Sequence, residues 1–138
     1  MSKSIPGQSA VGALLTAVAV TLILVTAYIH LSLGGLLFSL NGLGYISLAA
    51  LVIIVTVVHH PIVERFAWVP RVAIAGYAGV TIVSYLIVGP YFALGWIAKG
   101  VEIALIGVVA VDLIDAYGSP AGVVRGTLGS LQLERRTP

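Results

Sequence analysis

Hydrophobic residues form four long runs along this chain, and polar residues gather between the runs. The runs cover residues 11–33, 36–58, 72–88 and 94–114. Each comes close to the roughly 20 apolar residues that a helix needs to cross the hydrocarbon core of a bilayer. The pattern therefore predicts an all-α integral membrane protein with four transmembrane helices.

The connections between the runs predict how the helices follow one another. Gly34 and Gly35 leave only a tight turn between the first two helices, which must then be antiparallel neighbours. Residues 59–71 combine prolines, charged residues and a tryptophan, a mixture expected at a membrane interface. Gly89 and Pro90 end the third run. We therefore expect an up-down antiparallel four-helix bundle.

The lysines and arginines predict the orientation of the bundle. All but Lys99 lie near the termini or between the second and third runs: Lys3, Arg65, Arg71, Arg125, Arg135 and Arg136. With four spans these places lie on one side, which the positive-inside rule assigns to the cytoplasm. We expect a cytoplasmic segment 1–10, a membrane bundle 11–115 and a mobile or peripheral cytoplasmic tail 116–138. The protein is then a multi-pass component of a cytoplasmic cell membrane of the prokaryotic type.

Composition narrows the functional classes. The chain is 59% hydrophobic and only 9% charged, whereas a soluble domain carries about 25% charged residues. Its net charge of +2 comes without a basic block, which argues against nucleic-acid binding. The absence of cysteine excludes disulfides and thiolate catalysis. Because the sequence also lacks a phosphate loop, a G-x-S-x-G elbow and an H-E-x-x-H helix, we do not expect an enzyme that acts on its own.

One ionisable pair lies inside the fourth run. Lys99 and Glu102 are three residues apart and therefore share one face of a helix. Charged side chains are costly at membrane depth unless they are paired or belong to a functional pathway. This pair is therefore the main functional clue in the sequence.

Polar residues of the other three helices are expected at the same depth, in the outer half of the membrane. The proposed topology makes them converge, and their helical spacing gives each helix one polar face, as with Thr26 and His30 or Tyr77 and Thr81. The candidate residues for a ligand site or ion pathway are His30, Asn41, Tyr45, Tyr85, Lys99 and Glu102. The same residues could instead serve only as interhelical hydrogen-bond partners.

Histidine and acidic residues give few signs of a cofactor or metal. His30 could be a hydrogen-bond partner of Glu102 or Tyr45, or a single axial ligand of a haem or chlorin, but the other two histidines lie at the opposite membrane face. The set His59, His60 and Glu64 is too sparse to predict a metal site. The sequence therefore names no cofactor and no metal.

The acids at the far end of the fourth run have a structural interpretation. Asp112 and Asp115 lie near the C-terminus of that helix, where negative charge is unfavourable. We therefore expect a partner from another segment, such as Arg65 or Arg71.

Small residues predict where helices approach closely. Gly100, Ala104 and Gly107 form a stripe on the fourth helix, and Ala75 with Gly79 forms a shorter one on the third. We expect these stripes to contact neighbouring helices. Val109, in contrast, is expected to face lipid.

The sequence favours an accessory or structural subunit that packs in a larger membrane complex, because almost the whole chain lies within the bilayer. Its partners would be the lipid bilayer and other membrane subunits or a second copy of the chain. Two alternatives stay open. One is a small oligomeric transporter or channel that uses the polar cluster, and the other is a quinone- or pigment-binding module with His30 and Tyr45 as contacts.

Overall fold

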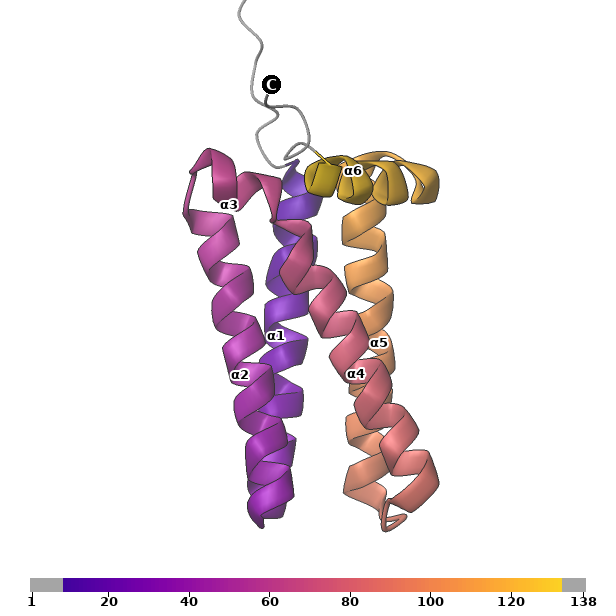
Figure 1. The fold of residues 1–138 in the computed structure, drawn as a ribbon. Helices are drawn as coiled ribbons and strands as arrows, with labels where there is room; N and C mark the ends of the chain where they lie inside the picture. Colours follow the sequence, from indigo (N-terminus) through magenta and orange to yellow (C-terminus); the bar gives the residue numbers. More distant parts are fainter. Residues whose placement is uncertain (1–8, 133–138) are drawn as a thin grey trace, which may run out of the picture.

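The computed structural model describes residues 9–132, which form six helices and no strand. The helices are α1 (Ala10–Leu33), α2 (Leu36–Val57), α3 (Pro61–Arg65), α4 (Trp68–Val88), α5 (Ala93–Tyr117) and α6 (Pro120–Gln132). Figure 1 shows α1, α2, α4 and α5 lying lengthwise beside one another, with α3 and α6 at the same end. The predicted all-helical fold is confirmed.

Three of the helices, α1, α2 and α4, are long and apolar enough to cross a membrane. The prediction of helices that are long and apolar enough to cross a membrane is confirmed for these three, and the fourth predicted span stays a prediction. α5 is the longest helix, with 25 residues, and it contains both Lys99 and Glu102 near its start and Asp112 and Asp115 near its end.

Local sequence signals explain where the long helices begin and end. The Ser9 hydroxyl caps α1 by accepting a hydrogen bond of 2.9 Å from the Gly12 amide. Gly34 and Gly35 have φ angles of 69° and 83°, so the turn between α1 and α2 uses backbone conformations that other residues rarely adopt. Gly118 ends α5 in the left-handed conformation, with φ 77°.

The core lies where α1 packs against both α2 and α5, and where α4 packs against α5. Alanines on α1 and α2 let these two helices approach closely, and larger side chains from α4 and α5 fill the remaining space. The central residues are Ala19, Ile23, Ala27, Ala49, Ile74, Leu105 and Val109. Val109 is only 1% exposed, so the expectation that it faces lipid was wrong. It lies one turn beyond Leu105, on the face of α5 that packs inward.

The small-residue stripe of α5 lies on the opposite face of that helix. Gly100, Ala104 and Gly107 are exposed, and a Cβ added at either glycine would meet no atom within 4 Å. A Cβ added at the half-buried Gly79 on α4 would also meet no atom within 4 Å. These three glycines therefore have open space beside them among residues 9–132, and a role of the stripes in helix packing stays a prediction.

The helix α6 was not expected, because the sequence analysis assigned this segment only to a mobile or peripheral tail. Its glycines give it low intrinsic helix propensity. In Figure 1 it lies across the end of the long helices. The Arg65 guanidinium donates to the Ser130 carbonyl through Nε at 2.7 Å, and Trp68 Nε1 donates to the Ser130 hydroxyl at 3.0 Å. Contacts to residues far away in the sequence thus fix a helix that local propensity does not predict.

Candidate functional site

A cavity of about 360 Å³ lies at the end of the molecule away from α3 and α6. The C-terminal parts of α1 and α4 and the N-terminal parts of α2 and α5 form its walls. Apolar side chains make up most of the lining, including Leu33, Leu37, Phe38, Val80, Val88 and Phe92. Three of these, Leu37, Val80 and Val88, are 65 to 80% exposed, so the apolar side of the cavity reaches the molecular surface.

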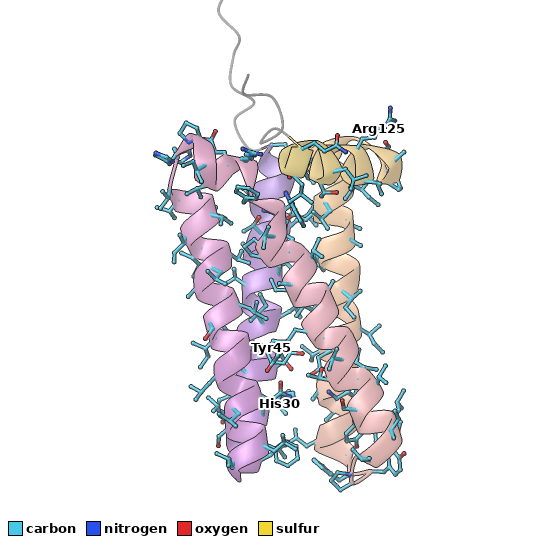
Figure 2. All side chains as sticks on the ribbon, in the orientation of Figure 1. His30, Tyr45 and Arg125 are labelled. Atoms are coloured by element: carbon cyan, nitrogen blue, oxygen red, sulfur yellow. The ribbon has the colours of Figure 1, made fainter. Side chains whose placement is uncertain are left out.

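Polar side chains from all four long helices also line the cavity: His30, Asn41, Thr81, Ser84 and Lys99. Figure 2 labels His30 and Tyr45, which lie between the helices in the half of the molecule away from α6, whereas Arg125 lies on α6 at the other end. The polar groups that the sequence placed at one depth therefore do meet in space.

Glu102 lies behind the polar wall of the cavity and contacts the residues that form it. Its side chain is completely buried, and it does not itself line the cavity. Carboxylate Oε2 accepts hydrogen bonds from Lys99 Nζ at 2.5 Å and from Thr81 Oγ1 at 2.8 Å. The other oxygen, Oε1, accepts from Thr26 Oγ1 at 3.3 Å and lies 3.6 Å from His30 Nε2. One buried carboxylate thus contacts three side chains of the cavity wall, which come from three helices.

Lys99 lines the cavity and retains unused donors. An ammonium group has three N–H bonds, and the only hydrogen bond of the Lys99 ammonium within the described residues goes to Glu102. The ammonium also lies 5.6 Å from the centre of the Tyr85 ring, within the range of a cation–π contact. Because the lysine is only 5% exposed, its remaining N–H groups have little access to water except through the cavity.

The imidazole of His30 faces the Glu102 carboxylate. Nδ1 of His30 lies 2.8 Å from the Thr26 carbonyl oxygen, which can only accept, so Nδ1 carries a hydrogen. Nε2, the other ring nitrogen, faces Oε1 of Glu102 at 3.6 Å. The imidazole therefore lies between the main chain of α1 and the buried carboxylate.

A chain of hydroxyl groups extends the cluster towards α2. Tyr45 is fully buried, and its hydroxyl lies 3.1 Å from Thr81 Oγ1. The one hydrogen of the Thr81 hydroxyl faces two acceptors, Glu102 Oε2 at 2.8 Å and the Ala78 carbonyl at 2.9 Å, so Thr81 accepts the hydrogen of the Tyr45 hydroxyl. The Tyr45 ring packs edge-on against the Tyr77 ring, and the Tyr77 hydroxyl donates to the main-chain carbonyl of Asn41 at 3.3 Å. These contacts tie α2, α4 and α5 together around the cavity.

Each sequence-predicted candidate lies in or beside this site, but in different ways. His30, Lys99 and Glu102 are in direct contact, Tyr45 reaches them through Thr81, and Tyr85 contacts Lys99 with its ring. Asn41 lines the cavity, and its side-chain Oδ1 is buried without a hydrogen-bond partner among the described residues. Whether these residues act in function stays a prediction.

Sequence reasoning did not single out Thr26 and Thr81 as partners of the carboxylate. Both were recognised only as members of polar helix faces. Threonines within a helix frequently bond to the backbone of their own helix, as Thr56 does to the Val52 carbonyl, so their sequence positions alone carry no sign of a longer-range partner.

The opposite end of the molecule holds the other ionic residues. Arg71 Nε donates to Asp112 Oδ2 at 2.6 Å, which supplies the partner expected for that acid, and Asp115 accepts from the Ser9 hydroxyl at 2.9 Å. His60 caps the short helix α3 through Nδ1. Over residues 9–132, no group of three histidine or acidic residues is arranged to hold a metal ion.

No family model matches this chain, and no curated protein or solved structure shows significant similarity to it.

Proposed function

We propose that this chain is a four-span membrane protein that binds a small amphipathic molecule in the cavity. The observation that carries the proposal is the completely buried Glu102, which holds His30, Thr81 and Lys99 on the cavity wall. If this ionic cluster served only to join the helices, Lys99 would not need to present unused N–H groups at the wall of a cavity. The volume of about 360 Å³ and the mostly apolar lining are typical of small-molecule sites.

The topology in this proposal makes α1, α2, α4 and α5 the spans and places both termini in the cytoplasm. A helix of 25 residues extends about 37 Å at 1.5 Å per residue, which is sufficient for α5 to cross the roughly 30 Å hydrocarbon core. Lys99, Glu102 and Asp112 of this helix are buried and paired, which lowers the cost of membrane insertion. The cavity then lies in the outer half of a cytoplasmic cell membrane, and its apolar opening faces lipid.

Reporter fusions test the topology. A reporter that is active only in the cytoplasm should give a signal when it is fused after Pro138 and none when it is inserted at Gly34. The reverse pattern would contradict four spans with cytoplasmic termini.

Ligand binding is tested by recovering molecules that stay with the protein in mild detergent and identifying them by mass spectrometry and absorption spectroscopy. Ser84 is exposed at the edge of the cavity, so Ser84→Trp should fill the site without disturbing the core. Ser47→Trp, at an exposed position on α2 outside the cavity lining, is the matched control. The wild-type protein and the control should retain a molecule that the Ser84 variant loses. An identical set of molecules in all three proteins would argue against the site.

A second function, as an accessory subunit or self-associating protein, is supported by the exposed stripe Gly100, Ala104 and Gly107. Small residues on a membrane helix allow the backbone of another helix to approach closely. Native mass spectrometry of the gently solubilised protein should then show a complex with another subunit or with a second copy. Ligand binding and membership in a complex are compatible with each other.

A further inference from the structure

Helix α6 turns its small residues towards the rest of the molecule. Gly122 and Gly126 are half-buried, and Ser130, four positions further on, is buried and accepts a hydrogen bond of 3.0 Å from the Trp68 indole. A Cβ at Gly126 would lie 2.5 Å from the ring of Tyr117, the last residue of α5. This side of α6 therefore has no room for larger side chains, and its contacts fix the rotation of α6 about its axis.

The large apolar residues of α6 lie on another face. Val124, Leu128 and Leu131 recur at intervals of four and three positions, so they form one stripe. They are 57, 51 and 56% exposed. A helix on the surface of a water-soluble domain has the opposite arrangement, with its large apolar residues towards the core. The exposed stripe therefore indicates that the surroundings of α6 on this side are themselves apolar.

A third face of α6 carries polar and small residues. Arg125, Gly129 and Gln132 are exposed and spaced at intervals of four and three, about 100° around the helix from the apolar stripe. The segment 120–138 has three arginines and one glutamate, which gives it a net positive charge. Because a guanidinium group binds phosphate oxygens well, the charge of this segment complements the phosphates of lipid head groups.

The position of α6 places the apolar stripe at the depth of these head groups. Figure 1 shows α6 lying across the end of the long helices, so it runs along the membrane plane when the long helices cross the membrane. Trp68 and Tyr117, against which α6 packs, belong to the two residue types that are concentrated at membrane–water interfaces. The stripe thus has lipid beside it, and the polar face has water.

We propose that α6 is an interfacial membrane helix. Val124, Leu128 and Leu131 insert among the acyl chains of the nearer leaflet, and Arg125 lies among the lipid phosphates. The partner of the exposed stripe is then the phospholipid of the membrane that holds the long helices. This inference rests on the proposed function only in that the long helices cross the membrane. It depends neither on the side that the termini face nor on a ligand in the cavity.

The test uses the absence of cysteine from the chain, which allows one spin label to be attached at a chosen position. Leu128→Cys places the label in the stripe, and Gly129→Cys, where a Cβ meets no atom within 4 Å, is the matched control on the polar face. Leu51→Cys, at an exposed position on α2, is the reference for a membrane span. The labelled proteins are placed in nanodiscs of phosphatidylethanolamine and phosphatidylglycerol. Electron paramagnetic resonance then measures collisions of the label with oxygen, which concentrates in lipid, and with a water-soluble nickel complex.

The Leu128 label should collide mainly with oxygen and lie about 5–10 Å below the lipid phosphates, as in other interfacial helices. The Gly129 label should collide mainly with the nickel complex. Equal collisions with the nickel complex at the two positions would overturn the inference. A Leu128 label that is shielded from both reagents would also overturn it, because a protein would then cover the stripe.

The Leu51 label separates this inference from the proposed membrane spans. If the Leu51 label lies in lipid while the Leu128 label lies in water, only the interfacial helix is wrong. If the Leu51 label itself collides mainly with the nickel complex, the proposed spans fail and the interfacial helix fails with them.

Discussion

The two ends of the helical assembly each bury an ion pair, but they bury it in different surroundings. At the α6 end, Arg71 donates to Asp112 and also to the Ala67 carbonyl, and both members of the pair are buried. At the other end, Lys99 and Glu102 are just as deeply buried, yet the lysine lines a cavity. The same kind of buried ion pair therefore occurs twice. In the covered pair, Arg71–Asp112, the cation has a second acceptor in the protein, whereas in the other pair the cation lies on the wall of a cavity.

This difference distinguishes the ion pair that belongs to the proposed binding site from the ion pair that only supports the fold. A buried pair gains little over an apolar pair, but removal of one partner is costly because the other charge is left without compensation. In the covered pair the consequence of a change should therefore be a loss of stability alone. In the pair beside the cavity, a change should affect both stability and the binding of a ligand.

Removal of Arg71 is expected to have the largest effect. Arg71→Met leaves Asp112 buried without its partner and also removes the bond to Ala67, so the free energy of unfolding should fall by about 3–5 kcal/mol. Equilibrium unfolding in detergent measures this loss. Arg125→Met is the control, because Arg125 is exposed and, among residues 9–132, bonds only to a carbonyl of its own helix. Equal stability of the two variants would show that the covered pair does not hold this end together.

Removal of the Glu102 charge should have a smaller effect on stability and a larger one on binding. Glu102→Leu should lower the free energy of unfolding by about 3 kcal/mol, the lower end of the range for broken buried pairs, because Lys99 can be hydrated through the cavity. Glu102→Gln keeps an acceptor for Thr81 and should cost less. Both variants should lose the retained ligand, as measured by the mass spectrometric assay. A Glu102→Leu protein that unfolds and binds as the wild type does would remove the case for a polar site.

The sequence predicted the membrane helices more completely than the site. Runs of about 20 apolar residues have few alternatives to a membrane helix, and so α1, α2 and α4 could be predicted from hydrophobicity alone. The pair Lys99 and Glu102 was apparent for a similar reason, since charge is rare inside such a run. Both inferences depend only on local composition and spacing.

Features that depend on contacts between distant segments were not apparent. Nothing in the sequence around Thr81 says that its hydroxyl reaches Glu102 as well as the Ala78 carbonyl of its own helix. Nothing around Val109 says which face of α5 packs inward. The cavity itself depends on which face each of the four long helices turns towards the others, and the sequence of one helix does not determine this. Helix α6 is held by the contacts of its Ser130 with Arg65 and Trp68, which lie more than 60 positions before Ser130 in the sequence.

Thr81 tests how much the hydroxyl chain contributes to the cavity end. Thr81→Val keeps the shape of the side chain but removes the donor to Glu102 and the acceptor for Tyr45, so a loss of about 1 kcal/mol in unfolding free energy is expected. Thr56→Val is the control, because within the described part of the chain the Thr56 hydroxyl bonds only to a carbonyl of α2. The loss of this hydroxyl should be nearly neutral. Equal unfolding free energies for the two variants would indicate that the chain of hydroxyls does not stabilise this end.

The smallest effect on the chain itself is expected on the exposed stripe of α5. A Cβ at Gly107 meets no atom within 4 Å, so Gly107→Leu should leave the stability of the monomer within about 0.5 kcal/mol or raise it slightly through better helix propensity. If the stripe contacts another helix of a partner or second copy, the leucine should still prevent that association by steric exclusion. Ala50→Leu, at an exposed position on α2, is the control. Native mass spectrometry should show loss of the complex in the Gly107 variant only, and an unchanged complex in both variants would mean that this face of α5 contacts lipid.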